Sequence, residues 1–164
     1  MRQAALPCLI ALLVGVIAWR PAALAPTAEP LPYPEGYRDW VHIRSTVIGP
    51  AHKRFATVGG FQHTYANPQA VVGYRAGVFP EGAVVVFDWL DMREEAGAFL
   101  EGPRRQVDVM VKDSLRYAAT GGWGFQRFVK DSRSELAASP TPEQCFACHN
   151  SLKKGDLVLS SYRP

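Results

Sequence analysis

Short apolar segments alternate with turn residues along most of this chain of 164 residues. Period-two alternation and β-branched residues predict five strands, at 39–48, 61–66, 83–90, 106–112 and 123–129. A short helix is expected at 69–76 and a helical turn at 135–138. A further helix is expected to begin at Thr141-Pro142-Glu143, which combine an N-cap residue with proline at the first helical position.

These elements predict an α+β fold, in which a predominantly antiparallel sheet of about five strands carries peripheral helices. Within the strand at 61–66, Phe61, His63 and Tyr65 are expected to share one face. The proline-rich segment at 26–36 is expected to be a tether or an ordered coil outside the core. Residues 37–164 are enough for one domain.

Residues 1–25 have the pattern of a secretory signal peptide. Arg2 precedes an apolar run from Ala4 to Trp19, and Ala23-Leu24-Ala25 offers a small-residue cleavage site. Cleavage there implies a periplasmic protein without membrane attachment. Because the apolar run is rather long, an uncleaved membrane anchor is the alternative interpretation.

Charge gives little reason to expect a nucleic-acid partner. The formal net charge is +3, and loss of Arg2 and Arg20 with the leader would lower it to +1. No run of basic residues interrupts this balance.

The strongest chemical signal is Cys145-Phe146-Ala147-Cys148-His149, a C-x-x-C-H run. This is the attachment signature of c-type haem: two thiols form thioethers, and the adjoining imidazole ligates iron. A redox dithiol and half of a zinc site are the alternatives. The only other cysteine, Cys8, lies in the leader, so the mature chain would keep no third thiol for zinc. We therefore expect one covalently attached haem c on the C-terminal helix.

Residues that follow the motif bear on the sixth iron position. Only fifteen residues follow His149, and none is methionine or histidine. Small electron-carrying cytochromes use a downstream methionine as sixth ligand, so an open position is expected here. Met110 lies on an alternating strand, where it is expected to fill the core, although it is chemically able to ligate iron.

Several short segments together resemble the cytochrome P-460 family, which includes the cytochromes c′-beta. These segments are Tyr37-Arg38-Asp39-Trp40-Val41, Tyr65-Ala66-Asn67-Pro68, Phe79-Pro80-Glu81-Gly82, Val111-Lys112-Asp113-Ser114, Gly122-Trp123, the C-x-x-C-H run and Gly155-Asp156-Leu157-Val158. The resemblance implies a mono-haem domain over 37–164, a homodimer, His149 as the proximal ligand and an open distal face.

The resemblance also separates two branches by chemistry. Members that oxidise hydroxylamine and nitric oxide bond a lysine to the haem edge, and that position corresponds to Phe87 here. The cytochromes c′-beta lack this crosslink and carry phenylalanines over the distal face. Phe87 is therefore a candidate distal residue, and Phe61 is a second candidate, for which packing in the core is the favoured interpretation. Arg127 is a candidate partner for a haem propionate.

Three functions remain open from the sequence. The favoured one is five-coordinate haem that binds nitric oxide, and other small gases such as CO, at an apolar distal face. The second is an enzyme that oxidises hydroxylamine or nitric oxide or acts as a peroxidase, which would require a distal acid or base such as His63. The third is electron transfer with a redox partner cytochrome, for which Met110 or a histidine would be the sixth ligand.

Overall fold

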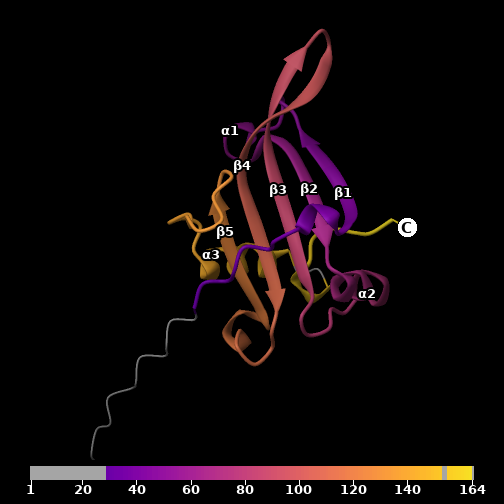
Figure 1. The fold of residues 1–164 in the computed structure, drawn as a ribbon, viewed down its shortest axis with the longest axis vertical. Helices are drawn as coiled ribbons and strands as arrows, with labels where there is room; N and C mark the ends of the chain where they lie inside the picture. The colour runs from indigo at the N-terminus through magenta and orange to yellow at the C-terminus, as the bar shows by residue number, and fades with distance from the viewer. Residues whose placement is uncertain (1–28, 153–154, 164) are drawn as a thin grey trace, which may run out of the picture.

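The computed structural model describes residues 29–152 and 155–163, and the predicted leader lies outside them. Five strands form one sheet in which each strand pairs antiparallel with the next in the chain (Figure 1). They are β1 (Val41–Ile48), β2 (Gly60–Ala66), β3 (Val84–Glu95), β4 (Ala98–Lys112) and β5 (Trp123–Val129). The helices are α1 (Phe55–Val58), α2 (Pro68–Ala76) and α3 (Pro142–Ser151), with 3-10 turns η1 (Tyr37–Asp39), η2 (Ala118–Thr120) and η3 (Gly155–Leu157). The predicted α+β class is confirmed.

Local sequence explains where α2 begins and ends. Asn67 caps it by accepting a hydrogen bond from the Ala70 amide at 2.9 Å, and Pro68 occupies the first turn. Gly77 ends the helix with φ of 79°, a left-handed conformation that glycine adopts without strain. The side chain of Asn67 also accepts from the Val84 amide at 2.9 Å, which fixes α2 to the start of β3.

The hairpin of β3 and β4 is longer than the sequence predicts. Its strands continue past 90 and begin before 106, and the tip projects from the body of the molecule (Figure 1). A tight turn at Ala96 and Gly97, with φ of 50° and 80°, closes the hairpin. Because this part of the hairpin is largely exposed, it carries no apolar alternation by which a strand could be recognised.

One expected element is absent, and one element is present that was not expected. Residues 135–138 form no helical turn; Leu136 instead makes an isolated antiparallel bridge with Phe128 beside β5. Helix α1 was not expected, and its four residues include none that is buried, so no apolar periodicity announces it.

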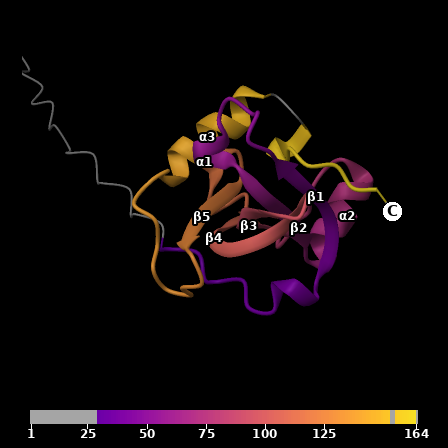
Figure 2. The ribbon, with the colours of Figure 1, turned by 90° about the horizontal axis from the view of Figure 1, so that it is seen from above.

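Both faces of the sheet are covered. Figure 2 shows α3 and the C-terminal segment on one side of the sheet and the N-terminal coil on the other. The first core cluster packs β-strand residues such as Val85, Met110 and Phe125 against α2 and the C-terminal segment. The second cluster includes Leu31, which is 6% exposed, so the proline-rich segment contributes to the core and the expectation that it would not is wrong.

A buried carboxylate anchors the second face. Asp88 on β3 has no exposed surface, and it accepts hydrogen bonds from the Tyr37 hydroxyl at 2.8 Å and from Nε of Arg104 at 2.6 Å. Burial, reinforced by the hydrogen bond to Asp88, raises the pKa of Tyr37. The residues 37–39 that precede β1 are thereby held against the centre of the sheet.

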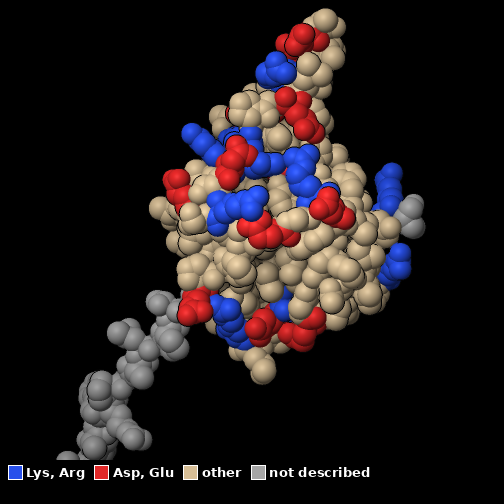
Figure 3. Space-filling model, viewed as in Figure 1, with Lys and Arg blue, Asp and Glu red and all other residues tan. Residues whose placement is uncertain are grey.

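The surface shows no concentration of one charge on the face drawn in Figure 3, where positive and negative side chains are interspersed. No helix within the described ranges is long and apolar enough to cross a membrane.

Candidate haem site

Helix α3 presents the C-x-x-C-H run, and its predicted start is confirmed. Thr141 is the N-cap and Pro142 follows it. Thr141 and Gln144 form a capping box, in which the Thr141 amide donates to the Gln144 side chain at 2.9 Å. Cys145 and Cys148 are three residues apart, and His149 is four from Cys145, so all three project from one side of the helix.

A backbone carbonyl from the segment after α3 orients the imidazole of His149. Its Nδ1 lies 2.8 Å from the carbonyl oxygen of Leu157, which can only accept, so Nδ1 carries the proton. The other ring nitrogen, Nε2, is then left with its lone pair for a metal. The ring of Phe125 lies 5.2 Å from the imidazole, centroid to centroid, and packs beside it.

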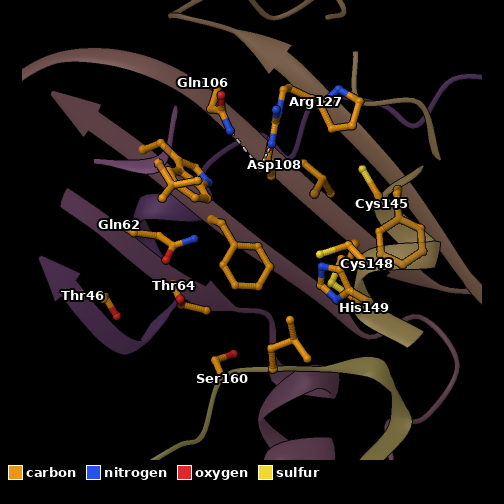
Figure 4. A pocket seen from close by; sticks show the side chains of 18 of the residues that line it. Thr46, Gln62, Thr64, Gln106, Asp108, Arg127, Cys145, Cys148, His149 and Ser160 are labelled. Carbon is orange, nitrogen blue, oxygen red and sulfur yellow. Dashed lines mark hydrogen bonds and ion pairs between the residues drawn. The ribbon is translucent and has the colours of Figure 1, made fainter. Parts of the chain in front are cut away.

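The motif opens onto a cavity of about 670 Å³ between α3, the sheet and the C-terminal segment. This volume lies within the range of about 300–1,000 Å³ that is usual for cofactor sites. Figure 4 shows the motif residues on one side of the cavity and side chains of the sheet on the other. Among the labelled residues, Cys145, Cys148 and His149 face Gln62 and Thr64 across this space.

Strand pairing arranges the cavity wall in rows that cross the sheet. The Phe87 row joins Arg44, Thr64, Phe87, Asp108 and Arg127, each from a different strand. The Trp89 row joins Thr46, Gln62, Trp89 and Gln106. Two residues from Asp108 and Arg127 on the same strands, Met110 and Phe125 pair on the apolar part of the wall. Every residue named in these rows lines the cavity. The wall is therefore mixed, and the expectation of an apolar face holds only for part of it.

Asp108 and Arg127 form an ion pair within the Phe87 row. Nε and Nη2 of Arg127 donate to the two carboxylate oxygens at 2.6 and 2.7 Å, and Gln106 adds a third hydrogen bond at 3.0 Å. Burial opposes the charge of Arg127, but the hydrogen bond and the charge of Asp108 outweigh it, so the pKa of the guanidinium is raised. Arg127 thus has a protein partner already.

The indole of Trp89 provides a test of whether haem fits. Its Nε1 is buried and finds no hydrogen-bond partner among the described residues. A buried donor without an acceptor is costly, and Trp89 lines the cavity. Haem carries two propionate carboxylates, which are acceptors, and Arg44 and Arg54 line the same cavity as cations. The residues therefore fit a flat apolar group with anionic edges, ligated by His149.

The two phenylalanine candidates have different fates. Phe87 is half-buried and lines the cavity. Phe61 does not line it: Gln62 and Thr64 point to the cavity, so Phe61 lies on the opposite face of β2, stacked on His63 at 6.1 Å. The expectation for Phe61 is corrected accordingly.

His63 shares the face of Phe61. It is bound by Ser45 at 2.7 Å and by Glu101 at 2.6 Å, so it does not serve as a distal base in this cavity. Sequence reasoning missed Trp89, Gln62 and Asp108. Once the strand register is known, Trp89 follows as the residue two positions from Phe87 on β3, Asp108 as the partner of Phe87, and Gln62 as the partner of Trp89.

The thiols differ in exposure: Cys145 is half-buried and Cys148 is exposed.

A model of the family described as cytochrome P460 matches residues 34–160, most of the chain. The protein belongs to the cytochrome P460 family. A comparison with curated proteins found no match. Membership of the cytochrome P460 family makes this a haem-binding cytochrome, in agreement with the resemblance carried by the sequence segments.

Proposed function

We propose that this cytochrome P460 protein carries one haem c, attached through Cys145 and Cys148 and ligated by Nε2 of His149. Each thiol adds across a vinyl group: a sulfur–carbon bond forms, the thiol proton goes to the neighbouring carbon, and no oxidant is needed. The support is the position of all three side chains on one side of α3, directly at the cavity.

We further propose that the protein binds nitric oxide and similar diatomic gases. A haem with one protein ligand supplies an iron position at which such a gas can bind. The observation that carries the proposal is Phe87 at the cavity wall, where crosslinked relatives are expected to have lysine. Among the described residues that line the cavity, His149 is the only histidine, and there is no lysine. Met110 lines it too, but is 2% exposed and packed in the core.

The direct test is the absorption spectrum of purified ferrous protein before and after nitric oxide is added, with a denatured pyridine spectrum beside it. A high-spin c-type spectrum that changes with the gas supports the proposal. A low-spin spectrum that ignores the gas contradicts it and favours electron transfer to a partner cytochrome. A strongly red-shifted, chemically altered haem would instead reveal a crosslink.

Two histidine variants make this test specific. His149→Gln removes the proposed iron ligand, so its spectrum and gas response should change. His63→Gln is the matched control, because His63 lies on the opposite face of β2 and contacts Ser45 and Glu101. Its spectrum and gas response should equal those of the unmodified protein.

One observation favours an enzyme as the second candidate. Asp108 is a carboxylate at the cavity wall, in the same row as Phe87. Its three hydrogen bonds from Arg127 and Gln106 occupy most of its acceptor positions, which limits its use as a base. Turnover of hydroxylamine by the native protein, lost in Asp108→Asn, would establish the enzymatic alternative.

We propose that the protein is exported to the periplasm and acts there as a homodimer. The leader sequence supports export. The mass of the mature protein tests cleavage after Ala25, and retention of the leader would indicate the membrane anchor instead. Sedimentation of the mature protein tests the dimer, which the family resemblance implies.

A further inference from the structure

A single carboxylate, Asp156, ties the segment after α3 to the end of the sheet. Its Oδ2 accepts from the Phe79 amide at 2.7 Å, and its Oδ1 accepts from Nζ of Lys112 at 2.6 Å and from Nε1 of Trp123 at 3.1 Å. Those donors come from the turn after α2, the end of β4 and the start of β5. The side chains of Asp156 and Lys112 are 13% and 11% exposed, so water competes weakly for this contact.

The backbone at Asp156 and Leu157 adopts a conformation that is sterically unfavourable for these residues. Asp156 has φ of 48° and Leu157 has φ of 61°, two consecutive left-handed residues that are not glycine. L residues avoid this region for steric reasons, so surrounding contacts must hold it. The three hydrogen bonds to the Asp156 side chain are contacts of this kind.

This strained geometry has a chemical result at the haem site. It directs the Leu157 carbonyl at Nδ1 of His149, 2.8 Å away. A hydrogen bond at the outer nitrogen of a ligating histidine fixes its tautomer and ring orientation, and it makes the other nitrogen a stronger donor to the metal.

We propose that Asp156 is a positioning residue for the axial ligand: by holding the Leu157 carbonyl in place, it sets the strength of His149 as an iron ligand. Lys112 and Trp123 act with it, because both donate to the same oxygen. This inference rests on the proposed function, in that it requires haem ligated by His149.

The test compares haem-loaded Asp156→Ala and Asp156→Asn with the native protein. Resonance Raman spectroscopy of the ferrous form gives the iron–histidine stretching frequency, and redox titration gives the reduction potential. Asp156→Ala should lower the frequency and raise the potential, since the Nδ1 hydrogen bond weakens. The frequency and the potential of Asp156→Asn should fall between those of the native protein and Asp156→Ala, because asparagine tolerates the left-handed region and keeps one acceptor oxygen.

Glu81→Ala is the matched control. Glu81 is also a carboxylate in the turn before β3 and accepts from the Ser114 amide at 2.9 Å, but it has no contact with Asp156, Leu157 or His149 among the hydrogen bonds of the described residues. This variant should leave both the frequency and the potential unchanged. A general loss of packing at this end of the molecule would instead shift the frequency and the potential of Asp156→Ala and Glu81→Ala alike.

The proposal is overturned if folded Asp156→Ala has the frequency and potential of the native protein, or if Glu81→Ala shifts equally. Should Asp156→Ala fail to fold, Lys112→Met removes one of the three donors and should shift both quantities in the same direction; no shift there would overturn the proposal. Failure of the proposed function appears separately, since the native protein would then lack an iron–histidine band or a response to nitric oxide.

Discussion

The buried carboxylate of Asp88 allows a stability prediction with a worked magnitude. The change is Asp88→Asn, which keeps the shape and removes the charge. The carboxylate is fully buried, and Arg104, whose side chain is 15% exposed, donates to both of its oxygens, at 2.6 and 3.2 Å. Removing one partner of a buried ion pair costs about 3–5 kcal/mol, because the remaining charge stays buried.

Two features place the expected loss near the lower limit of that range. Arg104 keeps an ion pair with the exposed Asp131, and the asparagine oxygen can still accept from the Tyr37 hydroxyl. We therefore expect a loss of about 3 kcal/mol, a large share of the roughly 5–15 kcal/mol that stabilises a typical domain. With a urea m-value of about 1–3 kcal/mol/M, the unfolding midpoint should fall by at least about 1 M.

The assay is urea unfolding of the haem-loaded protein, followed by far-UV circular dichroism. Asp131→Asn is the control: it removes the other partner of Arg104, but that partner is 74% exposed, so the loss should stay below about 1 kcal/mol. If Asp88→Asn loses no more than Asp131→Asn at equal m-values, burial does not make this pair important and the reasoning is refuted. Since Asp88 lies on the face away from the cavity, folded Asp88→Asn should bind nitric oxide normally.

Three further predictions concern the cavity wall and the first core cluster. Phe87→Ala should speed nitric oxide association in stopped-flow measurements, because a half-buried ring leaves the cavity wall; an unchanged rate would contradict its place there. In a Cys145→Ser/Cys148→Ser background, Trp89→Phe should hasten haem loss to a competing haem acceptor, because it removes an indole donor that has no partner among the described residues; an equal rate would argue against a propionate partner. Burial raises the pKa of Tyr74 to about 12. The folded protein therefore keeps a proton that the unfolded chain loses near pH 10, and stability should fall from pH 10 to about 12, less so in Tyr74→Phe.

The sequence predicts those parts of the site whose chemistry lies close together in the chain. Cys145, Cys148 and His149 belong to one helical turn and its cap, so local spacing is sufficient to find them. Strand positions were also recoverable from alternation, and β5 has the bounds that were expected, Trp123–Val129.

The wall of the cavity was harder to predict, because both faces of the sheet are buried in its central part. Alternation places Phe61 and His63 on one face of β2 and Gln62 on the other, but it does not say which face meets α3. Leu31 was missed for a related reason: a proline-rich coil has no periodicity, and only tertiary packing buries it. Asp88 stands within an apolar run, and its partner Arg104 is sixteen residues away.

The row arrangement of the wall has a consequence for how this scaffold can change. Each of the five strands contributes one side chain to the Phe87 row. Four of them also contribute a side chain to the Trp89 row, from a position two residues away on the same strand. Their immediate neighbours in sequence, such as Val86 and Asp88, face the other core. Single substitutions can therefore rewrite the chemistry of the cavity while the packing of the opposite face is left intact. Changes in the chemistry of the cavity and maintenance of the opposite core therefore depend on different residues of the same strands.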